Sequence, residues 1–134
     1  MKYSGQNLFY KAKTDLFEHN IAHFIDSAVT TWWNQREDAE QNNVDTCCGE
    51  GSTLNFLMMI HEKANKVGCA IAQFQGSKGK TTYMVCNYSY STVKGEKVYE
   101  SGEVASKCEK GINENYSALC NETEEIDWNK VAEV

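Results

Sequence analysis

Residues 66–91, KVGCAIAQFQGSKGKTTYMVCNYSYS, constrain the fold more than any other part of the chain. They hold two runs rich in β-branched and aromatic residues, Cys69–Phe74 and Thr81–Tyr88, with a turn-forming Gly-Ser-Lys-Gly segment between them. This pattern predicts an antiparallel β-hairpin. In a register centred on the turn, Cys69 and Cys86 lie nearly opposite each other, where Cβ atoms about 4.5–5.5 Å apart can accept a disulfide. We therefore expect a bridge between these two cysteines.

Length and charge limit the classes of protein to consider. The chain has 134 residues, which is typical of one domain, and a net charge of −6. Its lysines are scattered along the sequence, which argues against nucleic acid or an anionic membrane as the partner. No apolar run approaches the ~20 residues that span a bilayer. We expect a soluble protein without a transmembrane segment.

The six cysteines form an even set without a C-x-x-C arrangement. Such a set is more typical of a disulfide framework than of a zinc or redox site. Three triplets that begin at Asn87, Asn115 and Asn121 fit the N-glycosylation pattern. Together these features favour a secreted protein, although no secretory leader follows Met1. Reduced cysteines in the core of a cytosolic protein stay open as the alternative.

Helical patterns precede the hairpin. Apolar residues recur at intervals of three and four from Ile21 to Trp33, which predicts an amphipathic helix. Ser52 stands where an N-cap would, before a second, shorter apolar stripe that begins at Leu54. Two helices and a hairpin are too few elements to enclose a core well, so part of the fold is missing from these patterns.

The remaining cysteines fall outside these elements. The loop of residues 42–51 carries the adjacent pair Cys47 and Cys48. Cys108 and Cys120 are close enough in sequence to close a small separate loop.

Several segments carry a family resemblance, in order and at family-like spacings. They are Ser4-Gly-Gln-Asn-Leu8, Thr31-Trp-Trp-Asn-Gln35, Asn65-Lys-Val-Gly-Cys-Ala70, Cys86-Asn-Tyr88 and a tail pattern from Val98 to Cys120. These segments resemble the CAP superfamily of cysteine-rich secretory proteins, antigen 5 and pathogenesis-related proteins. The tail with its last two cysteines is most similar to the antigen 5-related, venom allergen-like branch of insects.

The resemblance implies an α+β fold, an α-β-α sandwich, in a secreted protein whose hairpin cysteines are bridged. It assigns residues 1–100 to a CAP domain that lacks its N-terminal helical part, and residues 101–134 to a cysteine-containing extension and polar tail. Two interpretations stay open: a piece of a longer secreted protein, or a short product that begins at Met1. Cys47 and Cys48 then have partners in the missing part, form a vicinal bridge, or are free thiols.

Many CAP proteins have a cavity with two histidines and two glutamates, which suit a divalent cation. Carried over residue by residue, the first histidine would lie before Met1, and the other three positions are Gln6, Gln35 and Asn55. An amide cannot become an anion and is a poor metal ligand. We therefore expect a degenerate cavity without a metal or another cofactor.

Other candidates for chemistry are weak. His19 and His23 have metal-ligand spacing but no visible third ligand, and we expect both, as well as His61, to be at least partly exposed. No Gly-x-Ser-x-Gly segment occurs, and the cysteines are expected in bridges rather than as nucleophiles. These observations predict that the protein is not an enzyme.

Three functions are compatible with the sequence. The first is a secreted antigen 5-like protein of venom, saliva or haemolymph type that binds a protein target through its surface. The second is a carrier of a small lipid, sterol or eicosanoid, with a lining that is more simply interpreted as core: Phe24, Trp32, Trp33 and Phe56. The third is a truncated or decayed gene product without a function of its own.

Overall fold

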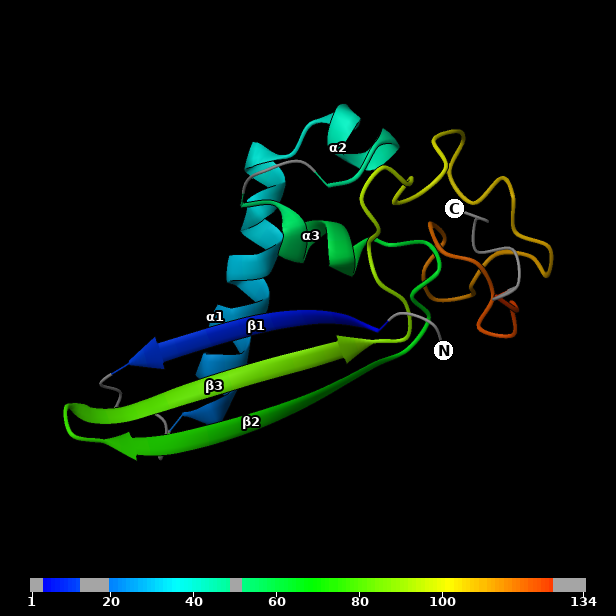
Figure 1. Cartoon of the computed structure of the whole chain (residues 1–134). Helices are drawn as coiled ribbons and strands as arrows, with labels where there is room; N and C mark the ends of the chain where they lie inside the picture. Colours follow the sequence, from blue (N-terminus) through cyan, green and yellow to red (C-terminus); the bar gives the residue numbers. More distant parts are fainter. Residues whose placement is uncertain (1–3, 13–19, 49–51, 127–134) are drawn as a thin grey trace. The chain divides into compact units, whose positions relative to one another are not determined.

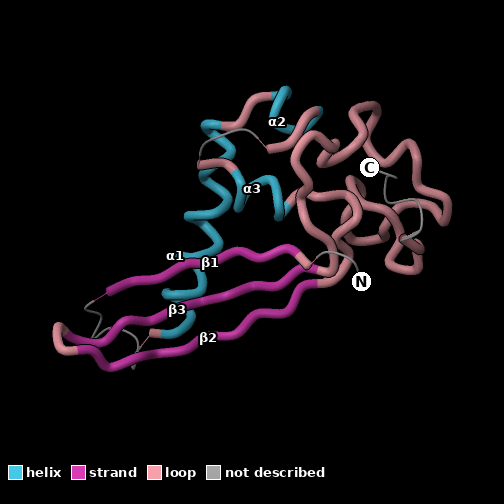
Figure 2. Tube along the Cα trace, viewed as in Figure 1, coloured by secondary structure: helices cyan, strands magenta, loops and turns pink. Residues whose placement is uncertain are grey.

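The computed structural model describes residues 4–12, 20–48 and 52–126. The chain folds into two compact units, Met1–Tyr99 and Glu100–Val134, which are described separately. The first unit contains the helices and the sheet. The second consists of turns and loops in its described part (Figure 2).

The first unit is built on a three-stranded antiparallel sheet with the order β1-β3-β2. Strands β2 (Val67–Gly76) and β3 (Gly79–Tyr88) confirm the predicted hairpin, and Cys69 pairs with Cys86 in the expected register. A disulfide joins these two cysteines. Gly79 has a φ of +116°, a conformation that L side chains rarely adopt, so this glycine permits the tight turn.

Strand β1 (Gly5–Ala12) is an element that the sequence patterns did not predict. It pairs antiparallel with β3, so that Gly5 lies opposite Tyr88 and Ala12 opposite Thr81. The addition of β1 makes β3 the central strand (Figure 1). The sheet is therefore completed by a strand far away in the sequence, which local periodicity cannot reveal.

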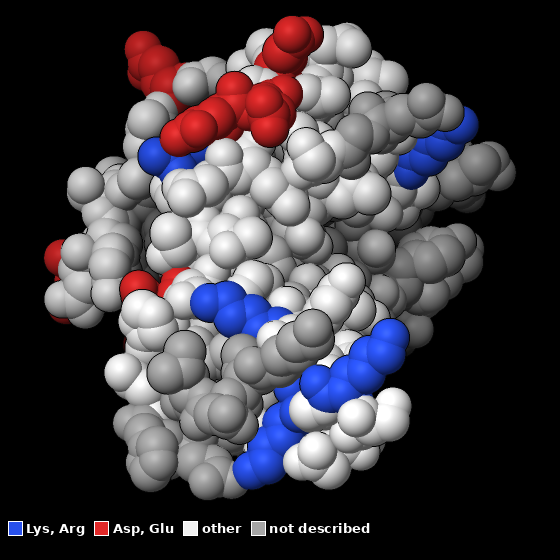
Figure 3. Space-filling model, turned by 90° about the vertical axis from the view of Figure 1, so that its left-hand side faces the viewer, with Lys and Arg blue, Asp and Glu red and all other residues white. Residues whose placement is uncertain are grey.

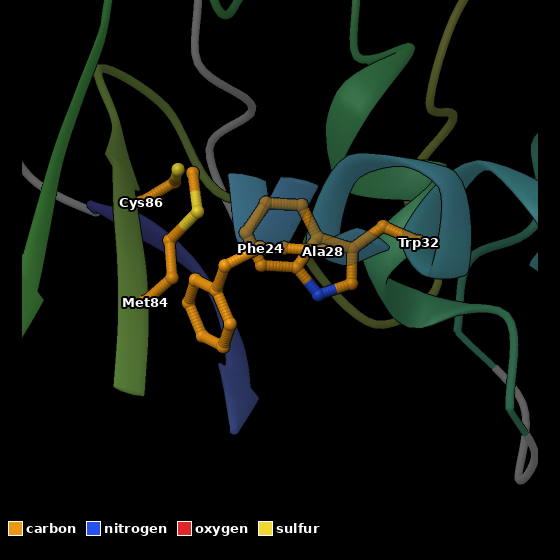
Figure 4. Close-up of a cluster of buried hydrophobic side chains, with 5 residues drawn as sticks. All are labelled: Phe24, Ala28, Trp32, Met84 and Cys86. Carbon is orange, nitrogen blue, oxygen red and sulfur yellow. The ribbon is translucent and has the colours of Figure 1, made fainter. Parts of the chain in front are cut away.

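Helix α1 (Ile21–Asn34) covers one face of the sheet, as Figure 1 shows. Asn20 is its N-cap, and the Asn20 side chain accepts a hydrogen bond from the backbone N–H of His23. A core cluster joins this helix to β3 (Figure 4); its buried members are Phe24, Ala28, Trp32, Met84 and Cys86. The 3-10 helix η2 (Gln35–Asp38) follows α1 directly.

Two short helices complete the unit, α2 (Gln41–Asp45) and α3 (Leu54–Met59). The N-cap of α3 is Thr53 rather than the predicted Ser52, and the Thr53 side chain makes no capping hydrogen bond. A second core cluster lies beside these helices; its buried members are Val44, Cys47, Leu57 and Val98. No described helix is long and apolar enough to cross a membrane.

In the second unit, a disulfide between Cys108 and Cys120 is the main cross-link. Ile112 forms an isolated β-bridge with Cys120. The carboxylate of Glu124 accepts hydrogen bonds from the backbone N–H groups of Glu109 and Lys110, and these bonds lower its pKa. In the described part of this unit the apolar side chains of Val104, Ile112, Tyr116 and Leu119 are exposed, so the disulfide and these hydrogen bonds contribute much of what holds it.

The bridge between β2 and β3 gives a first prediction. It links residues 17 positions apart, and a loop of this length contributes about 3 kcal/mol by restricting the unfolded chain. We expect the double variant Cys69→Ser/Cys86→Ala to melt more than about 10 °C lower, measured by circular dichroism.

The matched control is the double variant Cys108→Ser/Cys120→Ser, which removes the bridge of the second unit. We expect this control to leave the melting temperature of the sheet unchanged. Equal melting temperatures for the Cys69→Ser/Cys86→Ala variant and the unmodified chain would refute a stabilising role for the hairpin bridge.

Candidate functional site

The cavity positions carried over from the family come from three different elements. Gln6 lies on β1, Gln35 is the first residue of η2, and Asn55 lies in α3. The structure brings Gln35 and Asn55 together but not Gln6. The three amides therefore do not converge on one point.

Gln35 acts as a side-chain cap for α3. Its Oε1 accepts hydrogen bonds from the backbone N–H groups of Asn55 at 3.0 Å and Phe56 at 3.2 Å. The first N–H groups of a helix have no partner within the helix. Because Thr53 makes no side-chain cap, Gln35 supplies the acceptor that the local sequence lacks.

The side chain of Asn7, not that of Gln6, points into the protein. Asn7 is 1% exposed, and its Nδ2 donates to the carbonyl oxygen of Asn55 at 3.1 Å and to the Tyr88 hydroxyl at 3.2 Å. Asn7 thereby connects β1, β3 and α3. Burial raises the pKa of Tyr88, and the hydrogen bond from Asn7 acts in the opposite direction.

The close approach of β1 to α3 depends on Gly5. A Cβ atom at this position would collide with the Met58 sulfur and the carbonyl oxygen of Tyr90. Glycine is thus required for Asn7 to reach the backbone of α3.

Gln6 points to the opposite face of the sheet, because successive side chains of a strand alternate. Its Nε2 donates to Oδ1 of Asn87, its register partner on β3, at 3.0 Å. Both side chains are exposed. The matched position of the first family glutamate therefore lies outside the buried amide network.

The described residues contain no group of three or more histidine, cysteine or acidic side chains that could hold a metal ion. His19, one member of the predicted histidine pair, lies outside the described residues. His23 is exposed on the first turn of α1.

The expected partial exposure of His61 is wrong: the residue is buried, with 6% of its surface exposed. Its Nδ1 accepts a hydrogen bond from the backbone N–H of Lys63 at 3.2 Å, and its ring lies 4.8 Å from that of Tyr90. Burial, together with the positive charge of Lys63, lowers the His61 pKa to about 4.

The four aromatic residues of the predicted ligand lining divide into two pairs. Phe24 and Trp32 are buried in the core, and the Trp32 indole N–H donates to the carbonyl oxygen of Leu8 at 3.2 Å. Trp33 is 44% exposed, and its ring lies 5.4 Å from that of Phe56 in an edge arrangement. The guanidinium of Arg36 lies 5.5 Å from the Trp33 ring.

The remaining predicted positions are the adjacent cysteines and two asparagines of the glycosylation triplets. Cys47 and Cys48 form a disulfide with each other. Asn115 is exposed, and Asn121 is partly exposed with its Oδ1 bonded to the hydroxyl and the backbone N–H of Thr123.

The capping role of Gln35 predicts a loss of stability. Gln35→Ala leaves two backbone N–H groups of α3 without their acceptor, so we expect a decrease of about 1–2 kcal/mol in the free energy of unfolding, measured with urea at neutral pH. Gln35→Glu keeps an acceptor oxygen and should retain most of the stability.

Gln75→Ala is the matched control for this truncation, because the exposed Gln75 side chain donates only to the carbonyl of the next residue. We expect Gln75→Ala to change the free energy of unfolding little. Equal losses for Gln35→Ala and Gln75→Ala would contradict the capping role.

His61 predicts a pH dependence. Its folded pKa of about 4 lies below the ordinary value of 6.5, so between these values the unfolded chain binds a proton that the folded chain does not. Stability should therefore be unaffected by His61 above pH 6.5 and fall, by up to about 3 kcal/mol, as the pH decreases to 4.

Urea titrations across this pH range measure the effect. We expect His61→Gln to flatten the pH dependence and His23→Gln, at an exposed position, to leave it unchanged. An unaltered pH profile in His61→Gln would disprove the assignment.

Comparison with known proteins places these residues in a family. The model of the CAP family, described as the cysteine-rich secretory protein family, matches residues 2–88. Venom allergen-1 of Aedes aegypti is 29% identical over 93% of this chain and 50% of its own length. Tabinhibitin 4 of Tabanus yao is 30% identical over 79% of this chain and 43% of its own length.

Solved structures agree with this comparison. The structure of BmVAL-1 is 26% identical, with a TM-score of 0.68 over 92% of this chain and 62% of that one. A crystal structure of NaASP2 with Zn²⁺ shares the fold, with 21% identity and a TM-score of 0.61 over 90% of this chain and 60% of that one. The chain spans about half the length of the curated relatives it matches. With most of the first unit matched by the family model, the chain belongs to the CAP, or cysteine-rich secretory protein, family.

Proposed function

We propose that this chain is part of a secreted, non-enzymatic CAP protein of the antigen 5 type, which acts by binding a protein target through its surface. The proposal rests on one observation about the carried-over cavity positions. They are amides, and Gln35 uses its acceptor oxygen on the backbone of α3. A side chain engaged in this way holds a helix in place instead of a reacting group.

The chemistry of the amides supports the same conclusion. General acid-base catalysis needs a group that exchanges a proton near the working pH, and a zinc site needs imidazole, thiolate or carboxylate ligands. Gln6, Gln35 and Asn55 supply neither. His61 is the buried histidine of the described part, and its lowered pKa keeps it neutral at physiological pH.

Secretion is supported by the bridged cysteines and by the position of the glycosylation triplets. Disulfides persist mainly in oxidising compartments, and all six cysteines are bridged. The side chain of Asn115 is exposed, and that of Asn121 partly so. Both lie in the loop-rich second unit, where a glycan can be accommodated, whereas Asn87 lies on a strand next to bridged Cys86.

The alternative of a small-ligand carrier depends on Trp33 and Phe56, because Phe24 and Trp32 are already buried in the core cluster. Native mass spectrometry of the secreted protein tests it directly. A lipid that co-purifies with the unmodified chain and is lost in Trp33→Ala would favour the carrier over a protein-binding role.

Activity measurements test the proposal itself. We expect the purified chain to leave a peptide library and a panel of ester substrates uncleaved, with or without added zinc, and to retain no zinc after dialysis. The control is the same preparation after heat denaturation, which reveals any contaminating hydrolase. Hydrolysis by the folded chain that a chelator abolishes would overturn the proposal.

A further inference from the structure

Three asparagines begin an N-glycosylation triplet, and the structure gives each of them different surroundings. The triplets are Asn87-Tyr-Ser89, Asn115-Tyr-Ser117 and Asn121-Glu-Thr123. The sugar is attached to the side-chain nitrogen, Nδ2, of the asparagine, and the triplet requires a hydroxyl on its third residue. The position of this hydroxyl relative to the asparagine therefore distinguishes the three triplets.

At Asn121 the hydroxyl of the triplet contacts the asparagine itself. The Oδ1 of Asn121 accepts hydrogen bonds from the hydroxyl of Thr123 at 2.8 Å and from the backbone N–H of Thr123 at 2.9 Å. Its Nδ2 donates to no group of the described residues, and Thr123 is exposed. The Asn121 side chain is thus held in a turn that leaves the reacting nitrogen available.

The triplet at Asn87 lacks this arrangement because its hydroxyl is engaged elsewhere. Ser89 is buried, and its Oγ accepts hydrogen bonds from the backbone N–H groups of Asn65 and Lys66, both at 3.1 Å. The Oδ1 of Asn87 accepts instead from the side chain of Gln6 on the neighbouring strand. Both ends of this triplet are therefore part of the folded sheet and the loop beside it.

The triplet at Asn115 lacks the arrangement for a different reason. The turn here is formed by Asn113, whose Oδ1 accepts hydrogen bonds from the backbone N–H groups of Asn115 and Tyr116. Asn115 and Ser117 are both exposed, and in the described part of the chain the Ser117 hydroxyl makes no hydrogen bond to Asn115. This asparagine is accessible, but its side chain is not held.

The turn at Asn121 is local, so it can form before the chain folds. It needs only three consecutive residues, and asparagine side chains favour such turns. In the folded unit, the bridge between Cys108 and Cys120 is closed, and the backbone N–H of Asn121 donates to the carbonyl of Gly111 at 2.9 Å. These bonds fix the backbone of Asn121 and leave its side chain partly exposed, so the folded unit accommodates an attached sugar.

We propose that Asn121 is the N-glycan acceptor of this chain, selected over the other two triplets because Thr123 closes its side-chain turn. The oligosaccharide comes from a lipid-linked pyrophosphate donor. Nδ2 forms a bond to C1 of the first sugar, the bond between C1 and the phosphate oxygen breaks, and Nδ2 releases one proton to a base of the transferring enzyme. Hydrogen bonds to Oδ1 draw electron density from Nδ2 and assist this release. The inference rests on the proposed secretion, because this donor serves the secretory pathway.

A glycan at Asn121 lies next to apolar surface of the second unit. Leu119, two residues earlier, is 58% exposed, and Ile112, which pairs with Cys120, is 53% exposed. Uncharged surface occurs elsewhere on the chain too, and Figure 3 shows such an area between acidic side chains at the top of the view and lysines in its lower part. A hydrated oligosaccharide therefore adds hydration where Leu119 and Ile112 provide none.

Cell-free translation with microsomes tests the inference on the full chain. A cleavable leader placed before Met1 delivers the chain into the vesicles, and protection from added protease verifies its entry. We expect a single shift in gel mobility that peptide-N-glycosidase removes. This enzyme converts a glycosylated asparagine to aspartate, so peptide mass spectrometry should find aspartate at position 121 and asparagine at positions 87 and 115.

Matched variants separate the turn from the type of hydroxyl residue. Asn121→Gln should abolish the mobility shift, and the control Asn115→Gln should retain it. The double variant Ser117→Thr/Thr123→Ser exchanges the hydroxyl residues of the two triplets. We expect Asn121 to remain the more occupied site in this variant, because serine keeps the hydroxyl that closes the turn.

Several results would overturn the inference. They are a protease-protected chain without a glycan, a glycan at Asn87 or Asn115 in place of Asn121, or a transfer of occupancy to Asn115 in the exchanged variant. Because the added leader delivers the chain, these outcomes do not depend on its natural route. Recovery of the natural protein from the cytosol, or hydrolysis that a chelator abolishes, would instead contradict the proposed function, so the two failures are distinguishable.

Discussion

The buried carboxamide of Asn7 connects the sheet to the short helices. Its Nδ2 contacts the carbonyl of Asn55 on α3 and the hydroxyl of Tyr88 on β3, and Gly5 permits the approach. Gln35 holds the same helix from the end of α1 through two backbone hydrogen bonds. Since α3 has only six residues, it cannot be stable on its own, and these two amides fix its position beside α1 and β1.

Sequence reasoning predicted the parts of the fold that depend on short-range patterns. The hairpin, its register and α1 follow from turn residues and periodicity within about 30 residues of each other. Strand β1 pairs Gly5 with Tyr88, and such a distant partner leaves no mark in local periodicity. The buried state of His61 was missed for a related reason, because its ring packs against that of Tyr90, which only the fold brings close to it.

The site illustrates how strongly strand register decides which side chain is buried. Gln6 and Asn7 are neighbours, yet one is exposed and bonded to Asn87 while the other is among the most deeply buried polar residues. Family resemblance identified Gln6, and only the pairing of β1 with β3 shows which side chain points to α3. A polar residue two positions after the glycine that opens β1 was the available signal, and it gains meaning only once the close contact of Gly5 with α3 is known.

The sheet leaves an apolar face exposed. The sheet has α1 on one face, and its other face presents Leu8, Tyr10 and Phe74 at 46%, 60% and 61% exposure. The rings of Tyr10 and Phe74 both contact Tyr83 on the central strand. Apolar surface left in water costs about 25 cal/mol per Å², so this ordered apolar face is a surface on which association releases free energy.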